Sequence, residues 1–202
     1  MAFYSILLLK TIIMKNPKLL DRKVLYDHFF RVEEFKFAAE NSEETLNRYL
    51  VERPDATAIL LYNEDRYAIV LVQQFRVAAL GKDDPPNLWE IPAGIIEPGE
   101  VPSETIIRET YEETGYQISN PAFINQCYAS PGTFSEKFFL YYAQVNDRDR
   151  KNMGGGNDDE NEHLKVVEIP VKTLYSMMDE GDIMDAKSLV ALYWFRSRHS
   201  NG

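Results

Sequence analysis

A loop followed by a helix rich in acidic residues occupies residues 94–116, which read GIIEPGEVPSETIIRETYEETGY. The pattern predicts a helix over residues 103–114, with Ser103 as its N-cap and Gly115 directly after its C-terminal end. Three glutamates of this helix are spaced i, i+3 and i+4, which places their carboxylates on one helix face: Glu109, Glu112 and Glu113.

The acidic face has two readings. Like charges at these spacings weaken a helix by roughly 0.2–0.5 kcal/mol per pair, and such a face is often simply solvated. Glu100 in the preceding loop adds a fourth acid, and grouped carboxylates suit Mg²⁺ or Mn²⁺. Arg108 is expected to hold one acid, Glu100, and so to fix the loop against the helix.

The overall charge of the chain limits which molecules it can bind. The 202 residues carry 22 Lys plus Arg and 32 Asp plus Glu, which gives a net charge of −10. This field repels phosphate, so we expect no general binding of nucleic acid or of an anionic membrane. A phosphate-bearing substrate would need a metal ion or a local arginine cluster. A single cysteine, Cys127, excludes an intrachain disulfide and fits a cytoplasmic location.

The N-terminal stretch at residues 3–14 is apolar but too short to span a bilayer, and Lys10 interrupts it. It also lacks the features of a secretory signal. Two readings stay open: a strand or packed terminal arm, or an upstream extension of a chain whose natural start is Met14.

The rest of the chain alternates strands and helices. Strands are expected within residues 20–60, where aromatic and β-branched residues are frequent, and at 58–63, 67–75, 88–94, 122–130, 137–145 and 166–170. Residues 81–87 and 146–162 are expected to be loops. Two C-terminal helices are expected at 171–181 and 186–199, and Asp185 is placed to cap the second.

With its loop, the acidic helix resembles the signature of the Nudix hydrolases. All seven fixed residues of that signature are present at the right spacing: Gly94, Glu100, Arg108, Glu109, Glu112, Glu113 and Gly115. Thr110 and Tyr116 depart from it, because aliphatic residues are usual there. The resemblance implies an α/β (α+β) fold with a mixed sheet between helices over residues 51–202, preceded by a strand-rich segment at residues 1–50.

The resemblance also implies a metal site. The family holds Mg²⁺, for which Mn²⁺ substitutes, and cuts the pyrophosphate bond of nucleoside diphosphates linked to another group. Carried over to this chain, the ligands would be Glu109, Glu112, Glu113 and the backbone carbonyl of Ala93. Glu113 would bridge ions, while Glu100 and Arg108 would support them.

A narrower resemblance concerns the substrate. Pro131, Gly132 and Glu136 form an S-P-G-x-x-x-E stretch typical of the ADP-ribose hydrolases, which release AMP and ribose 5-phosphate. The run QFRVA at 74–78 and the glycines at 154–156 instead resemble GDP-mannose hydrolases of the same branch. ADP-ribose is the first expectation and GDP-mannose or another nucleoside diphosphate sugar the alternative. A nucleoside triphosphate pyrophosphohydrolase and a non-catalytic ligand sensor agree less well.

Several side chains outside the signature are candidates for substrate contacts. Arg48, Arg53 and Arg76 have the geometry to grip phosphate, although each also reads as an ordinary surface arginine. Phe30, or its neighbour Phe29, would stack on the base, and core packing is the alternative.

The general base is expected outside the acidic helix. The loop at 146–162 is long, contains three glycines and ends in acidic residues. In the branch of ADP-ribose and GDP-mannose hydrolases that this chain resembles, a glutamate in such a run takes the proton of the attacking water. Glu160 aligns best and Glu162 is the alternative, while a merely solvated acidic loop is the competing reading. The same branch uses its N-terminal strands for a homodimer, and an isologous dimer is also the commonest assembly.

Overall fold

The computed structural model describes residues 17–38, 45–156 and 164–199. The chain forms two compact units, residues 1–53 and 54–202, and each is described by itself. Met14 and the apolar stretch before it lie outside the described residues. Among the helices that are described, none is long and apolar enough to cross a membrane.

Three antiparallel strands make up the first unit, in the order β1-β2-β3: β1 (Lys18–Asp27), β2 (Arg31–Ala38) and β3 (Thr45–Glu52). Every residue of β1 is exposed in the single chain. Among the described residues of this unit only Glu33, on β2, is buried, and it accepts a 2.8 Å hydrogen bond from Nε of Arg22. Three short strands alone rarely bury a core, so apolar side chains of this unit stay exposed to solvent.

A seven-stranded sheet organises the second unit, in the order β10-β5-β4-β9-β8, with β6 added to β5 and β7 added to β4. Its strands are β4 (Ala56–Asn63), β5 (Ala68–Phe75), β6 (Asn87–Glu90), β7 (Ala93–Ile95), β8 (Ala122–Tyr128), β9 (Lys137–Val145) and β10 (Lys165–Pro170). β4 and β9 are parallel and the other pairs are antiparallel, so the sheet is mixed.

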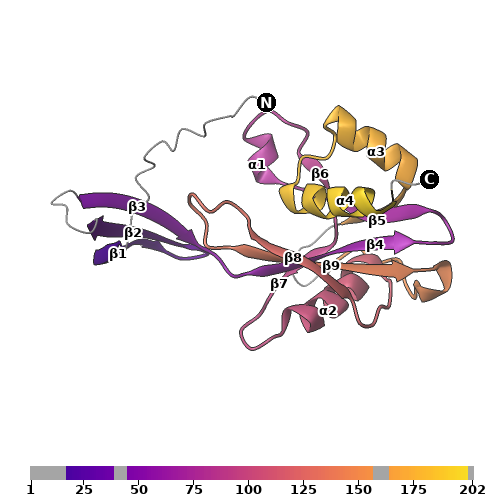
Figure 1. Ribbon diagram of the computed structural model, residues 1–202, viewed down its shortest axis with the longest axis horizontal. Coiled ribbons are helices and arrows are strands. Elements are labelled where there is room, and N and C mark those ends of the chain that lie inside the picture. The colour runs from indigo at the N-terminus through magenta and orange to yellow at the C-terminus, as the bar shows by residue number, and fades with distance from the viewer. Residues whose placement is uncertain (1–16, 39–44, 157–163, 200–202) are drawn as a thin grey trace, which may run out of the picture. The chain divides into compact units, whose positions relative to one another are not determined.

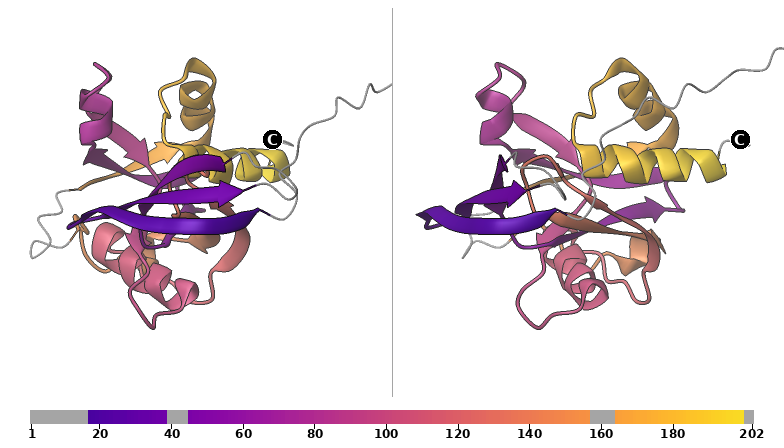
Figure 2. Two further views of the ribbon diagram at one scale, coloured as in Figure 1. Left: turned by 90° about the vertical axis from the view of Figure 1, so that its left-hand side faces the viewer. Right: turned by 60° about the vertical axis from the view of Figure 1, so that its left-hand side comes forward.

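Helices cover both faces of this sheet. α2 (Pro102–Thr114) lies on one face, while α3 (Val171–Glu180) and α4 (Ala186–His199) lie on the other (Figures 1 and 2). The short helix α1 (Val77–Leu80) follows β5, and a single turn of 3-10 helix, η1 (Asp147–Asp149), follows β9. The expected mixed sheet between helices is confirmed.

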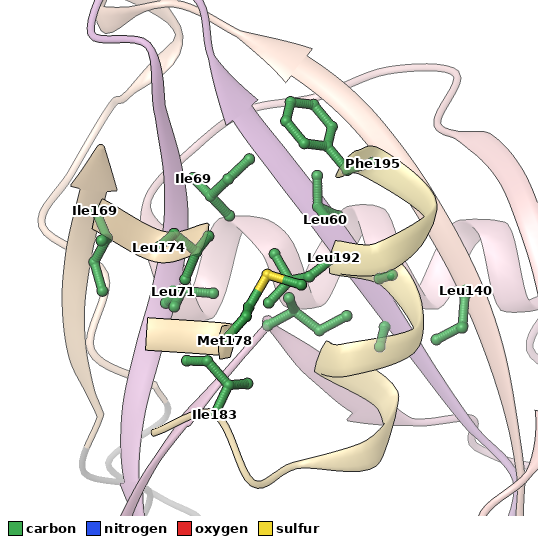
Figure 3. Packing of buried hydrophobic residues seen from close by; sticks show 13 residues of the cluster. Leu60, Ile69, Leu71, Leu140, Ile169, Leu174, Met178, Ile183, Leu192 and Phe195 are labelled. Carbon is green, nitrogen blue, oxygen red and sulfur yellow. The ribbon is translucent and has the colours of Figure 1, made fainter. Parts of the chain in front are cut away.

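The alternation of side chains along β4 explains the two-sided core. Ala58 and Leu60 point to the face under α3 and α4, whereas Ile59 and Leu61 point to the face under α2. All four are completely buried, because neighbouring strands and helices cover both faces. Figure 3 shows the core on the face under α3 and α4, where Leu60 packs near side chains of these two helices.

Two local expectations need correction. Ser103 does not cap α2: the helix begins at Pro102, its N-cap is Val101, and no side chain caps it. Proline is favoured at the first helical position because its fixed φ suits the helix and its missing N–H is no loss there. The expected loop at 146–162 begins with η1, which Asn146 and Asp149 stabilise as a capping box.

The cap of α4 is confirmed. Oδ2 of Asp185 accepts a 2.9 Å hydrogen bond from the backbone N–H of Ser188. The side chain therefore satisfies one of the N–H groups that a helix start leaves without an intrahelical partner.

Candidate active site

Gly94 lets the acidic helix approach the sheet closely. The residue lies in β7, and a Cβ built on it would stand 2.0 Å from Cδ of Glu109. Any side chain here would displace the Glu109 carboxylate, which is only 13% exposed. The first glycine of the signature is therefore needed for the position of the first glutamate on α2.

Glu113 is the buried acid of the site. The residue is 2% exposed, and its Oε2 accepts a 3.0 Å hydrogen bond from the backbone N–H of Ala93. Ala93 was expected to take part through its carbonyl, and the structure shows that its N–H orients Glu113. A buried carboxylate is costly unless hydrogen bonds or a cation compensate it.

Arg108 connects the acids of the loop and the helix. Its guanidinium lies 3.4 Å from Glu100, 2.9 Å from Glu109 and 3.0 Å from Glu112. Burial works to lower the pKa of Arg108, but the charge of Glu109 and the bonds to the other acids outweigh it and raise this pKa. The expected pair with Glu100 is present as part of a three-acid arrangement.

Glu100 closes the loop before α2. Its Oε2 accepts hydrogen bonds from the backbone N–H of Glu97 at 3.1 Å and from the hydroxyl of Thr105 at 2.9 Å. These two bonds, followed by Arg108, lower the pKa of Glu100. The ionised acid is therefore fixed by the loop and the helix together, which suits a supporting role.

The carboxylates of α2 are chemically suited to bind a divalent cation. Among the described residues no three acidic, histidine or cysteine side chains are gathered as a ready-made set of ligands, and Arg108 is paired with Glu109 and Glu112. Carboxylate oxygens are nevertheless the ligands that Mg²⁺ and Mn²⁺ prefer. Glu109, Glu112 and the buried Glu113 therefore supply oxygen donors of the right kind for such a cation.

The segment after η1 is bound to the C-terminal end of α2. The backbone N–H of Gly155 donates a 2.8 Å hydrogen bond to the carbonyl of Glu113, and that of Lys151 donates one of 2.8 Å to the carbonyl of Gly115. A Cβ on Gly154 would lie 2.3 Å from the Glu113 carbonyl. Gly154, the first glycine of the run, therefore packs closely behind Glu113, and Gly155 contributes the hydrogen bond. Sequence reasoning noted the run and missed this contact.

This packing predicts a specific loss of stability. Gly154→Ala should lower the free energy of unfolding by at least about 2 kcal/mol, because it adds a left-handed backbone cost to an overlap with backbone atoms. Gly181→Ala is the matched control: its φ of +86° resembles the +66° of Gly154, but nothing lies within 4 Å of its Cβ. Urea unfolding should separate the two variants, and equal losses would contradict the packing role.

Tyr116, which replaces an aliphatic residue of the signature, lies in a buried polar network. Its hydroxyl donates to Glu168 at 2.8 Å and accepts from Nδ2 of Asn63 at 3.0 Å. Burial, followed by the bond to Glu168, raises the pKa of Tyr116 to about 12. The network joins the end of α2 to β4 and β10, so Tyr116 has a structural role.

Arg76 is engaged by the protein itself. Its Nε and an Nη lie 2.6 and 2.8 Å from the two carboxylate oxygens of Glu90, which Lys187 also contacts. The hydrogen bond to Glu90 raises the pKa of Arg76. Burial alone would raise the pKa of Glu90, but Arg76 and Lys187 lower it. The structure therefore brings this candidate phosphate ligand to a buried acid.

The remaining candidates are spread over the chain. Pro131, Gly132 and Glu136 lie in the connection between β8 and β9, where Ser130 accepts two backbone hydrogen bonds of a turn. Arg48, Arg53 and Phe30 belong to the first unit. Arg48 is exposed on β3, and Phe30 lies in the β1–β2 turn with its ring 5.4 Å from that of Tyr26. Glu160 and Glu162 lie outside the described residues.

A cavity of about 520 Å³ adjoins the loop of the signature. Glu97, Pro98, Gly99 and Glu100 line one side of it, and Phe139 of β9 lines another. The volume is within the range of small-molecule sites. Space for a ligand therefore lies next to Glu100, the acid that Arg108 connects to α2.

The chain is similar to known proteins of one family. Residues 52–191 match the family model described as NUDIX domain. The "GDP-mannose pyrophosphatase" of Cronobacter sakazakii is 31% identical over 187 residues, covering 91% of this chain and 96% of that protein. The protein of the same name from Escherichia coli O139:H28 is 30% identical, with 90% and 95% covered.

A solved structure shows the same fold. The structure titled "Crystal structure of ADP compounds hydrolase" superimposes with a TM-score of 0.73 at 22% identity, over 93% of this chain and 96% of that one. The complete signature, the mixed sheet between helices and the family match over residues 52–191 lead to one conclusion. This chain belongs to the Nudix family of hydrolases.

Proposed function

We propose that the protein is a Mg²⁺-dependent pyrophosphatase of nucleoside diphosphate sugars, and that Mn²⁺ can substitute. The observation that carries the proposal is the arrangement of Glu109, Glu112 and Glu113 on α2, with Gly94 and Ala93 packed against two of them. Hard oxygen donors on one rigid helix suit a divalent cation bound to pyrophosphate.

The residues of the site have separate proposed roles in hydrolysis. Glu109, Glu112 and Glu113 would hold the cation, which supplies charge neutralisation and acidifies a water molecule. Arg108 lies among Glu100, Glu109 and Glu112 and would keep the acids in place. Water oxygen bonds to one phosphorus while the bond from that phosphorus to the bridging oxygen breaks, and a general base takes the proton. Glu160 is the first candidate base and Glu162 the second.

GDP-mannose and ADP-ribose are the two candidate substrates. ADP-ribose is favoured by the stretch that contains Pro131, Gly132 and Glu136. GDP-mannose is favoured by relatives named for that activity, which match about nine tenths of both chains. We place GDP-mannose first, because the relatives match along nearly the whole length and the stretch covers only seven residues. Hydrolysis would yield GMP and mannose 1-phosphate.

A substrate panel tests the proposal. GDP-mannose, ADP-ribose, ADP-glucose and a deoxynucleoside triphosphate are each incubated with the protein and Mg²⁺, and kcat/KM is measured for each. The expected result is the highest kcat/KM for GDP-mannose, with ADP-ribose second. Preference for the triphosphate would overturn the substrate class, and no turnover of any compound would favour a ligand sensor.

A homodimer is part of the proposal. The first unit exposes many large apolar side chains in the single chain: Leu19, Leu20, Val24, Leu25, Tyr26 and Tyr49. Apolar surface of this extent usually marks an interaction site, and a two-fold dimer is the commonest assembly. The substrate contacts proposed for Arg48, Arg53 and Phe30 belong to the same unit, so dimer and activity should depend on each other.

Removing the first unit tests this dependence. A chain without residues 1–53 should be monomeric by light scattering and should lose most activity, because it lacks the proposed interface and three proposed substrate contacts. A chain without residues 1–16, which keeps every described strand, serves as the control and should stay dimeric and active. An active monomer without residues 1–53 would refute the dimer proposal.

A further inference from the structure

A second groove lies on the other side of the sheet from the acidic helix. It has a volume of about 850 Å³ and is formed by the β4–β5 turn, the start of α3 and the end of α4. α3 and α4 cover one face of the sheet and α2 covers the opposite face (Figure 1). The groove is therefore separate from the candidate active site, and the proposed hydrolysis does not use it.

Aromatic rings make up much of its wall. The rings of Tyr62 and Phe195 have centroids 5.2 Å apart, and the ring of His199 stacks on Phe195 at 4.0 Å with an interplanar angle of 16°. Tyr175 also lines the groove, and its hydroxyl is buried without a hydrogen-bond partner among the described residues. A buried polar atom without a partner usually has a reason, and a ligand is one such reason.

Tyr67 at the groove is held in an unusual conformation. Its φ is +48°, and the residue is 73% exposed. A bulky residue in the left-handed region costs free energy of order 1–3 kcal/mol, and such strain concentrates at functional sites. Tyr67 lies in the β4–β5 turn, and its exposed ring borders the groove.

The charge of the groove differs from that of the chain. Arg66 and Lys172 line it, and none of its described lining residues is acidic, although the chain carries a net charge of −10. Arg66 forms an ion pair with Asp147, 2.7 Å away, which partly neutralises its charge. Lys172 is therefore the more available cation for a ligand. Lys172 lies in the first turn of α3, where the helix dipole also favours an anion.

We propose that this groove binds a nucleoside monophosphate. The ligand's flat base suits the exposed ring of Tyr67 at this wall, since base–aromatic stacking tolerates any base. Its phosphate suits Lys172 and Arg66. A volume of about 850 Å³ is in the range of small-molecule sites. The inference is independent of the proposed hydrolysis, because it uses no residue of α2 or of the loop before it.

Equilibrium dialysis with AMP tests the proposal on the full chain. EDTA is included so that no divalent cation bridges AMP to the acidic helix. The expected result is saturable binding at one site per chain, with adenosine and ribose 5-phosphate each binding more weakly than AMP. Tyr67→Gly should weaken AMP binding by at least about fivefold, the lower end of a single stacking contribution. Lys172→Gln should weaken it by about two- to fivefold, the range of an exposed ion pair.

Matched variants make the outcome decisive. Lys165→Gln and Tyr193→Ala change an exposed lysine and an exposed tyrosine outside the groove and should leave the AMP affinity unchanged. Thermal melting establishes that each variant is folded, and either groove variant alone is sufficient for the decision. Absence of saturable binding overturns the proposal, as does AMP binding that neither Lys172→Gln nor Tyr67→Gly weakens.

Discussion

Glu113→Gln is expected to lose at least about 10²-fold in kcat/KM while the protein stays folded. Substitution of residues that merely support a metal ligand already costs roughly 10–100-fold, so a ligand itself should cost at least as much. Glutamine has the same shape and retains an oxygen that accepts the hydrogen bond from Ala93, which is 3.0 Å in the native protein. What is lost is the negative charge of a residue that is 2% exposed.

The control for this variant is Glu104→Gln. Glu104 is an exposed acid in the first turn of the same helix and is not part of the signature. It should keep nearly full activity, with an unchanged requirement for Mg²⁺. Metal titrations of both variants separate weaker cation binding from a general effect of charge. Near-normal turnover by Glu113→Gln at saturating Mg²⁺ would remove Glu113 from the metal site.

Glu160→Gln is expected to lower kcat by roughly 10²–10⁴, the usual contribution of a positioned general base. KM and the affinity for Mg²⁺ should change little, because a base acts mainly in the transition state. The measurement is steady-state kinetics at several Mg²⁺ concentrations. Loss of activity through a raised KM instead would indicate a substrate-binding role.

Two further variants distinguish the candidates in the same acidic run. Glu162→Gln tests the alternative base, and Asp158→Asn is the control for removal of one charge from this run. The control should keep most of its kcat. If the two glutamate variants both retain more than about a tenth of kcat, below the smallest effect of a general base, the base lies elsewhere.

Individual strands and the acidic helix were predictable from the sequence because they depend on local patterns, whereas the mixed sheet was implied by the family resemblance. β4 reads as a nearly continuous apolar run because it is buried on both faces, and Asp185 caps α4 through a contact with a residue three positions later. The signature likewise concentrates its glycines and acids within 23 residues. Such features are visible without knowledge of long-range contacts.

Contacts between distant segments were not predictable in the same way. Nothing near Glu113 in the sequence indicates that Gly154 and Gly155 pack against its carbonyl, because this contact depends on the path of the chain after β9. Arg76 was assigned to substrate from its residue type, and its pairing with Glu90 depends on the alignment of β5 with β6. The Ser103 cap failed because proline at the preceding position starts the helix one residue earlier.

Product analysis in ¹⁸O-labelled water tests the central claim most directly. The intact protein is incubated with GDP-mannose and Mg²⁺, and the products are identified by mass spectrometry. We expect GMP and mannose 1-phosphate in equal amounts, with one ¹⁸O atom on only one of the two phosphates and no cleavage in EDTA. The central claim would be contradicted by release of free mannose or GDP, or by the absence of metal-dependent cleavage of both GDP-mannose and ADP-ribose.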